Sequence, residues 1–329
     1  MRRRLSVWAY LGGWSLVRRL PAPVAYRLST LVADVAWRRR TAGVRRLEAN
    51  LARVRPELDA AGLRALSRRG MRSYLRYWCD SFRLPSWSPE QIRACVRVEG
   101  DGPVRASLAA GQGVVAALSH QGNWDLAGAW SALDLSRVTT VAERLEPVEV
   151  FDAFLAYRTR IGIDVLALGD DGVFLALVRA VRAGRLVPLL CDRDLSRNGI
   201  EVDLCGNPAR MAAGPATLAE LTGAPLHPVS IWYEAQDSRP RAAAGGSGSG
   251  YRIVLRFHPA VPVPDLPTKG ERIRARTQAC AQALGEGIAE HPQDWHMLQP
   301  VFSADLDPAR VARAQRAARG QTGAGVAGA

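Results

Sequence analysis

The chain has 329 residues, 48% of them hydrophobic, so it is long enough to bury one large core or two small ones. Its net charge is +13, and because Lys269 is the only lysine, nearly all the positive charge is arginine. This charge reflects either a compositional bias toward Arg and Ala or an anionic partner such as nucleic acid, phospholipid or a phosphorylated small molecule. The odd count of five cysteines and the lack of C-x-x-C spacing argue against a disulfide framework or a zinc site. No apolar run reaches the roughly 20 residues that a membrane span requires.

Residues 1–90 are predicted to be helical and basic. The opening "MRRRLSVWAYLGGWSLVRRL" is like a signal peptide, but Arg18 and Arg19 close its apolar run and no A-x-A site follows, so we interpret it as retained. Arginines beside Trp and Leu are typical of helices on an anionic membrane surface; the alternative for each helix is packing on its own protein. A later helix carries an aromatic stripe, Tyr74, Tyr77, Trp78 and Phe82, at a spacing that suits packing.

From about residue 96, strand-like runs alternate with helical ones. Strands are expected at 113–119, 137–143, 163–168, 185–192, 200–206, 226–234 and 251–259. Helices are expected at 123–135, 147–162, 172–184, 214–223 and 271–292, the first with Asn123 as its N-cap. This alternation predicts an α/β fold in which helices flank a central, mostly parallel mixed sheet. We therefore divide the chain into a membrane-associating segment (1–90), an α/β core (91–307) and a basic, largely disordered tail (308–329).

The stretch "LSHQGNWD" contains His120 and Asp125, where a predicted strand gives way to a predicted helix. Ligands of open α/β sheets bind beyond the carboxyl ends of strands, which is where His120 falls. If Asp125 folds back onto one ring nitrogen, it fixes the tautomer and leaves the other nitrogen free to take a proton from a substrate hydroxyl. The alternative is that Asp125 merely favours the helix N-terminus and His120 fills a turn.

The string "LSHQGNWDLAGAW" resembles the H-x4-D motif of the lipid A and glycerophospholipid acyltransferases. This resemblance implies an α/β fold like that of glycerolphosphate acyltransferase. Further similarity lies in "VAERLEP", in "YRTRIG" and in the region from "VPLLCDRDLSRNGIEVDLCG" to "LHPVSIWY". The resemblance covers roughly residues 1–300 and is strongest to the phosphatidylinositol mannoside acyltransferases of actinobacteria. One departure is "LCG" at 204–206, where the lipid A branch often has "FFG", which leaves the preferred acyl chain open.

The resemblance implies transfer of a long acyl chain, typically palmitoyl, from acyl-CoA to a mannose hydroxyl of a phosphatidylinositol mannoside. His120 would be the general base and Asp125 its orienting carboxylate. It further implies a peripheral enzyme at the cytoplasmic face of the cell membrane, with acyl-CoA as co-substrate and no other cofactor.

Several polar residues are candidates for binding substrate, each with a structural alternative. Glu143 by resemblance positions the sugar or the ring, or it is a solvent-facing strand end. Arg158 matches a family arginine near the substrates, or it complements a helix dipole. Arg193 could hold a phosphate, or form a salt-bridge cluster with its neighbours Asp192 and Asp194. The predicted substrate-binding set is Glu143, Arg144, Arg158, Arg193, Asp194 and Glu201.

Other functions fit less well. A lipid A-type or lysophospholipid acyltransferase would use the same mechanism on another acceptor. A nucleic-acid-binding protein would explain the charge, but no recognised module is present. A non-catalytic membrane scaffold would not need His120 and Asp125 together. The other histidines, at 227, 258, 291 and 296, lack metal-ligand spacing, so no metal site is predicted.

Overall fold

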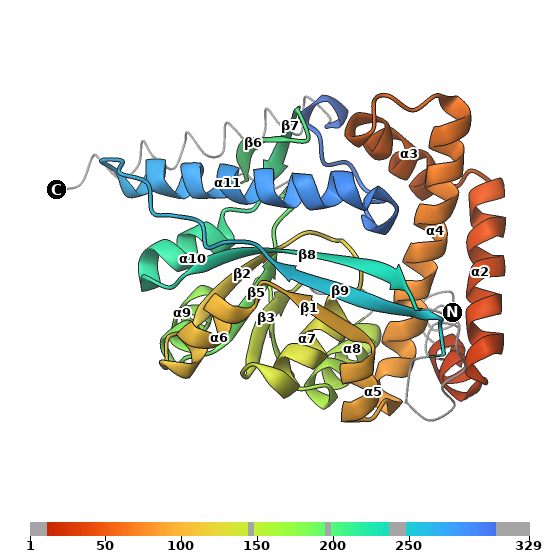
Figure 1. The fold of residues 1–329 in the computed structure, drawn as a ribbon, viewed down its shortest axis with the longest axis horizontal. Helices are drawn as coiled ribbons and strands as arrows, with labels where there is room; N and C mark the ends of the chain where they lie inside the picture. The colour runs from red at the N-terminus through yellow and green to blue at the C-terminus, as the bar shows by residue number, and fades with distance from the viewer. Residues whose placement is uncertain (1–11, 144–147, 195–198, 237–247, 307–329) are drawn as a thin grey trace.

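The structure is a computed structural model that describes residues 12–143, 148–194, 199–236 and 248–306. Its centre is a seven-stranded mixed sheet with the strand order β1-β9-β8-β2-β5-β3-β4 (Figure 1). Five strands run parallel to one another, and β9 pairs antiparallel to β8 and parallel to β1. The strands are β1 (Val96–Glu99), β2 (Val114–Leu118), β3 (Val138–Ala142), β4 (Ile163–Ala167), β5 (Leu186–Leu190), β8 (Leu226–Ala235) and β9 (Tyr251–Phe257). The predicted α/β class with a mostly parallel sheet is confirmed.

Helices cover both faces of this sheet because its central strands are apolar on both sides. In β2, Val114, Ala116 and Leu118 belong to the core on one face, and Val115 and Ala117 to the core on the other, as the two-residue period of a strand requires. The first face packs against α5 (Pro89–Ala94), α6 (Gly102–Ala109), α7 (Trp124–Asp134) and α8 (Val148–Arg160). The second packs against α9 (Val173–Arg182), α10 (Gly214–Thr222) and α11 (Lys269–Glu290).

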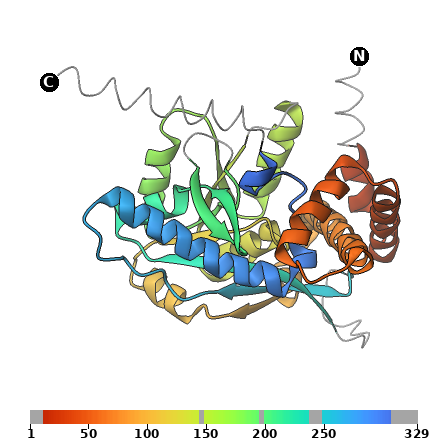
Figure 2. The same ribbon diagram turned by 90° about the horizontal axis from the view of Figure 1, so that it is seen from above.

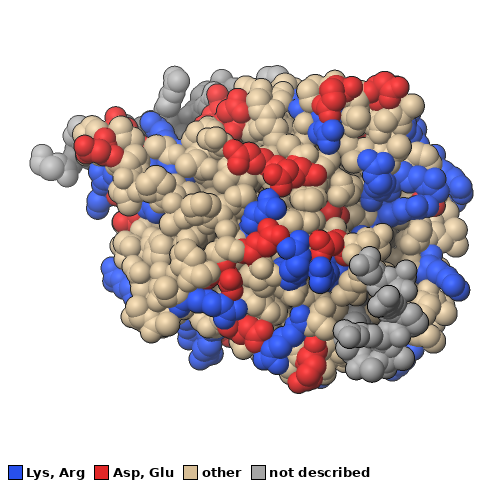
Figure 3. Space-filling model, in the orientation of Figure 1, with Lys and Arg blue, Asp and Glu red and all other residues tan. Residues whose placement is uncertain are grey.

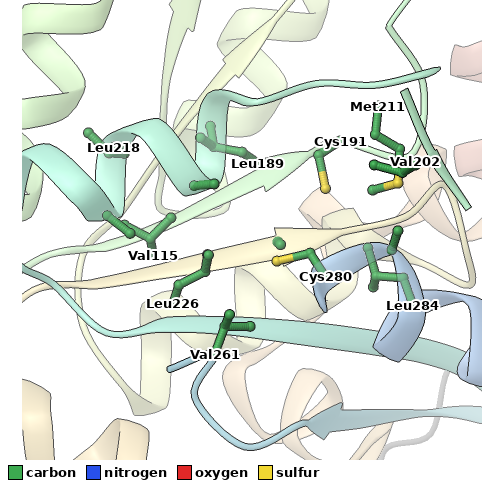
Figure 4. Close-up of a cluster of buried hydrophobic side chains, with 14 of the residues drawn as sticks. Val115, Leu189, Cys191, Val202, Met211, Leu218, Leu226, Val261, Cys280 and Leu284 are labelled. Carbon is green, nitrogen blue, oxygen red and sulfur yellow. The ribbon is translucent and has the colours of Figure 1, made fainter. Parts of the chain in front are cut away.

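A two-stranded antiparallel hairpin, β6 (Ile200–Leu204) and β7 (Asn207–Met211), lies outside the central sheet. Figure 4 shows Val202 and Met211 of the hairpin in one cluster with Cys191, Cys280 and Leu284. The predicted strand at 200–206 therefore exists, but it forms this separate hairpin. Neither β1 nor β7 was predicted from the sequence.

The N-terminal helices are α2 (Ala22–Arg38), α3 (Ala42–Val54) and α4 (Ala60–Arg83). They share a small core that includes Leu47, Leu51 and Leu66. They stand at the end of the sheet toward which the arrowhead of β8 points, and the turned view shows them gathered there (Figures 1 and 2). Among the described residues, no helix combines the length and the apolar character needed to cross a bilayer.

Candidate active site

Two polar residues follow neighbouring strands at the same edge of the sheet. His120 comes two residues after β2, and Asp192 comes two residues after β5. The strands are parallel and pair in register, with Leu118 opposite Leu190, so their carboxyl ends lie together. This is the edge at which α/β proteins bind ligands.

His120 and Asp192 form a hydrogen-bonded pair. The distance from Nδ1 of His120 to Oδ1 of Asp192 is 2.6 Å, and the backbone N–H of His120 donates to Oδ2 at 2.9 Å. The indole Nε1–H of Trp295 donates to the same Oδ2 at 2.9 Å. The carboxylate is fully buried, whereas the imidazole is 33% exposed.

The electrostatics of the pair favour a charged carboxylate. Burial opposes its ionisation, but the adjacent His120 and the N–H donors outweigh burial and hold the pKa of Asp192 below its ordinary value. An ionised Asp192 accepts a hydrogen bond from the N–H at Nδ1, so Nε2 is the nitrogen left to accept a proton from a ligand. The arrangement can therefore act as a general base whose conjugate acid is stabilised.

Asp125 does not play the part expected from the H-x4-D spacing, and this expectation is corrected. Its Oδ1 accepts from Nε of Arg158 at 2.9 Å, and its Oδ2 accepts from the hydroxyls of Tyr77 at 3.0 Å and Ser81 at 3.5 Å. The Asp125 and Arg158 side chains are 1% and 9% exposed, so they form a buried ion pair. The imidazole is instead oriented by Asp192, which the sequence analysis considered only as part of a salt-bridge cluster.

The position of the helix explains this difference. Asn123 caps α7 as predicted, since its Oδ1 accepts from the N–H of Leu126 at 2.9 Å. Asp125 thus lies in the first helical turn, where α4 supplies Tyr77 and Ser81 and α8 supplies Arg158. The N-terminal helices therefore contribute directly to the surroundings of the motif.

The loop between β2 and α7 is held rigidly. Gly122 has φ +65°, and a Cβ there would lie 2.5 Å from the carbonyl oxygen of Ile231, so only glycine fits. The Gly122 N–H donates to the carbonyl of Asp294 at 2.8 Å, and Nε2 of Gln121 donates to the carbonyl of Gly287 at 2.8 Å. The loop that carries His120 is consequently fixed by chain segments more than 160 residues away in sequence.

A second histidine lies close to this loop but is a weak base. His296 is 6% exposed, and Ser73 Oγ lies 2.9 Å from its Nε2. Burial, with a contribution from Arg76, lowers the pKa of His296 to about 3. His296 is therefore neutral at physiological pH, which leaves His120 as the better candidate base.

The other predicted binding residues lie at different places. Glu143 is exposed just after β3, and Arg144 lies outside the described residues. Arg193 and Asp194 are half-exposed and directly follow Asp192, and the N–H of Asp194 donates to the carbonyl of Arg210 at 2.8 Å. Glu201 is exposed on the hairpin, opposite Arg210 of β7. Arg158 lies in the last turn of α8, where it is buried against Asp125.

A narrow cavity of about 40 Å³ opens beside the ion pair. Its walls are apolar side chains of the sheet, such as Leu118, Val141 and Leu190, with Trp124 of α7 and the pair Asp125 and Arg158. The cavity lies on the α7 and α8 side of the sheet, and its wall at Leu118 is two residues from the half-exposed imidazole of His120. In the part of the chain that the structure describes, no cluster of three or more metal-ligating side chains is found.

Comparison with known proteins decides the family. The family model described as "Bacterial lipid A biosynthesis acyltransferase" matches residues 1–304. The chain belongs to this acyltransferase family. A phosphatidylinositol mannoside acyltransferase of Mycobacterium tuberculosis (strain CDC 1551 / Oshkosh) is 40% identical over 315 residues, which are 94% of this chain and 93% of the relative. One of Mycolicibacterium smegmatis is 38% identical over 308 residues, 92% of this chain and 93% of the relative.

Because it belongs to this family, the protein is an enzyme, an acyltransferase. The matched region includes both β2 and β5 and therefore both members of the His120–Asp192 pair. It also includes Trp295 and the N-terminal helices α2 to α4. The site described above thus lies within the part of the chain that defines the family.

Proposed function

We propose that this enzyme transfers a long acyl chain, palmitoyl in particular, from acyl-CoA to a mannose hydroxyl of a phosphatidylinositol mannoside. The names of the mycobacterial relatives support this acceptor. The observation that carries the chemistry is the half-exposed imidazole of His120, backed by the buried Asp192. Such a pair needs no protein nucleophile, because the acceptor hydroxyl itself attacks the thioester.

In the proposed mechanism, Nε2 of His120 takes the proton of the mannose hydroxyl as its oxygen attacks the thioester carbonyl carbon. A C–O bond forms, and the carbonyl π electrons move onto oxygen to give a tetrahedral intermediate. When the intermediate collapses, the C–S bond breaks and the electron pair leaves with the CoA sulfur. The imidazolium, stabilised by Asp192, returns the proton to that thiolate, so the enzyme ends as it began.

The polar residues around the pair are proposed to bind the substrates. Arg193 and Asp194 directly follow Asp192 and suit the sugar or a phosphate group. Glu143 and Glu201 would act from the end of β3 and from the hairpin, and Arg144, which lies outside the described residues, keeps the binding role that the resemblance implies. Asp125 is assigned a different role from His120. It holds Arg158 and α4 in place and so supports the wall of the apolar cavity.

The first experiment is acyl transfer by the purified full-length enzyme. Palmitoyl-CoA is supplied with a mannosylated phosphatidylinositol, with a lysophospholipid or with a lipid A precursor, and the products are analysed by mass spectrometry. We expect one acyl chain on the mannosylated acceptor and no product with His120→Ala. Product on the lysophospholipid or lipid A precursor alone would replace the proposed acceptor, and full activity of His120→Ala would refute the proposed base.

We also infer that the enzyme works as a peripheral protein on an anionic membrane, at its cytoplasmic face. The outer side of α2 carries a stripe of exposed aliphatic side chains: Val24, Leu28, Leu31, Val32 and Val35, which are 36–57% exposed. Exposed arginines precede and follow the stripe, at 18, 19 and 38–40, and the acidic residue of the helix, Asp34, is buried on the other side. Figure 3 shows basic side chains gathered over the N-terminal helices. Apolar residues between cations suit an interfacial helix.

Co-sedimentation with vesicles tests this inference. The variant Leu28→Asp/Leu31→Asp should bind anionic vesicles at least several-fold more weakly than the wild type, because charge replaces inserting side chains. Thr30→Asp is the matched control for one added charge on an exposed position of the same helix. Equal binding of the double variant and the wild type would show that α2 does not meet the membrane.

A further inference from the structure

Asp192 accepts a third hydrogen bond, from a residue that belongs to neither its own strand nor the His120 loop. The indole Nε1–H of Trp295 donates to Oδ2 of Asp192 at 2.9 Å, 103 residues away in sequence. Trp295 is fully buried and lies in the core on the α10 and α11 face of the sheet, edge-on to Phe302 with ring centroids 6.2 Å apart. A large planar side chain packed in this way has no freedom to turn its N–H elsewhere.

The two carboxylate oxygens of Asp192 have different hydrogen-bond partners. Oδ1 bonds the imidazole, and Oδ2 accepts both the His120 N–H and the Trp295 N–H, each at 2.9 Å. Two donors from different directions fix the plane of the carboxylate, so that Oδ1 stays directed at Nδ1. With the indole donor removed, a single backbone donor would hold Oδ2, and the carboxylate could rotate about its Cβ–Cγ bond.

The residues on either side of Trp295 hold the other member of the pair. The N–H of His296 donates to the carbonyl of His120 at 2.7 Å, and the carbonyl of Asp294 accepts from Gly122 at 2.8 Å. Trp295 itself forms an isolated antiparallel bridge with Gln121. The segment 294–296 therefore holds both the backbone around His120 and the side chain of Asp192 in place.

We propose that Trp295 is a positioning residue of the acyltransferase, whose indole N–H fixes the Asp192 carboxylate and, through it, the tautomer and orientation of His120. This inference rests on the proposed function of His120 and Asp192. Trp295 touches no substrate in this scheme, so its removal should lower the rate of the chemical step and leave substrate binding intact.

The test is Trp295→Phe, which removes the N–H and keeps an aromatic ring. We expect kcat to fall about 10- to 100-fold while the KM values for acyl-CoA and acceptor stay within about two-fold. Trp37→Phe is the matched control, because its indole N–H also donates a hydrogen bond, to Ser67 Oγ at 3.0 Å, but lies in the N-terminal helices. If Trp295→Phe does not fold, benzothienylalanine introduced at position 295 keeps the shape of indole and lacks only the N–H.

A double variant separates positioning from packing. In an Asp192→Ala background the indole N–H has no carboxylate to hold, so adding Trp295→Phe should cost no further activity. An additive loss, or a Trp295→Phe enzyme with the wild-type kcat, would overturn the inference.

Proton NMR gives a readout that does not depend on turnover. A short Nδ1–H bond to a carboxylate gives a far-downfield resonance, which should weaken or move in Trp295→Phe and persist in Trp37→Phe. An unchanged resonance in Trp295→Phe also overturns the inference. If instead His120→Ala keeps its activity while the resonance depends on Trp295, the proposed function fails and the positioning contact stands.

Discussion

The two buried carboxylates beside the His120 loop have the same chemistry and different partners. Asp125 faces the guanidinium of Arg158, which is charged at every accessible pH, and both side chains are almost fully enclosed. Asp192 faces an imidazole, which can gain and lose a proton and is one-third exposed. The first pair is suited to holding helices together, whereas the second is suited to proton transfer. Sequence spacing did not distinguish them, because only the partner decides the role.

The largest expected difference between the two carboxylates is in catalysis. Asp192→Asn should lower kcat by about 10²- to 10⁴-fold, because the amide no longer stabilises the imidazolium or enforces the tautomer. Acyl transfer followed by mass spectrometry measures the loss. Asp164→Asn, at a carboxylate 42% exposed on β4, is the control. If Asp125→Asn lost as much activity as Asp192→Asn at unchanged stability, our division of roles would be wrong.

The second expected difference is in stability, for which Asp125 should matter more than Asp192. Asp125→Ala should lower the free energy of unfolding by about 3–5 kcal/mol, because it leaves Arg158 buried without a counter-ion. Urea denaturation measures this value. The double variant Asp125→Leu/Arg158→Met should recover part of the loss, since it removes both charges together. If the double variant were less stable than Asp125→Ala, the unpaired charge of Arg158 would not be the cause of the loss.

A third carboxylate, Asp34, is expected to give a smaller effect on stability, one that depends on pH. Asp34 accepts two hydrogen bonds from each of Arg68 and Arg72, and these arginines hold the pKa of its carboxyl far below the ordinary value. A depressed folded pKa gives stability that is complete above the unfolded pKa, near 4, and is lost as the pH falls through the folded pKa. Asp34→Asn should therefore cost about 1 kcal/mol at pH 7, a modest value because the arginines are partly exposed. Thermal unfolding from pH 7 to pH 2 should show the gap between variant and wild type closing below about pH 4; a constant gap would mean that charge is not the cause.

Local sequence signals predicted much of the fold. The apolar runs predicted seven of the nine strands that the described residues contain, and the cap at Asn123 and the position of His120 after β2 followed from residues adjacent in the chain. The strands missed were β1, which has only four half-exposed residues, and β7, which contains Pro208. Both lack the continuous apolar run of a central strand.

The partner of His120 could not be predicted in the same way. It depends on β2 lying between β8 and β5, an order that does not follow the chain, and on a contact across 72 residues. Asp192 was visible in the sequence as the acidic residue after a buried strand, but so was Asp194. The nearer Asp125 fitted a simple local turn, and only the packing of α4 and α8 assigns it elsewhere.

The contact between Trp295 and Asp192 has a consequence for the biogenesis of the enzyme. Trp295 follows Asp192 by 103 residues in the chain, so a chain synthesised from its N-terminus contains β2 and β5 well before it contains the indole that holds the Asp192 carboxylate. Fragments that stop before residue 295 should therefore lack the hydrogen-bonded arrangement around His120, even when both strands are present.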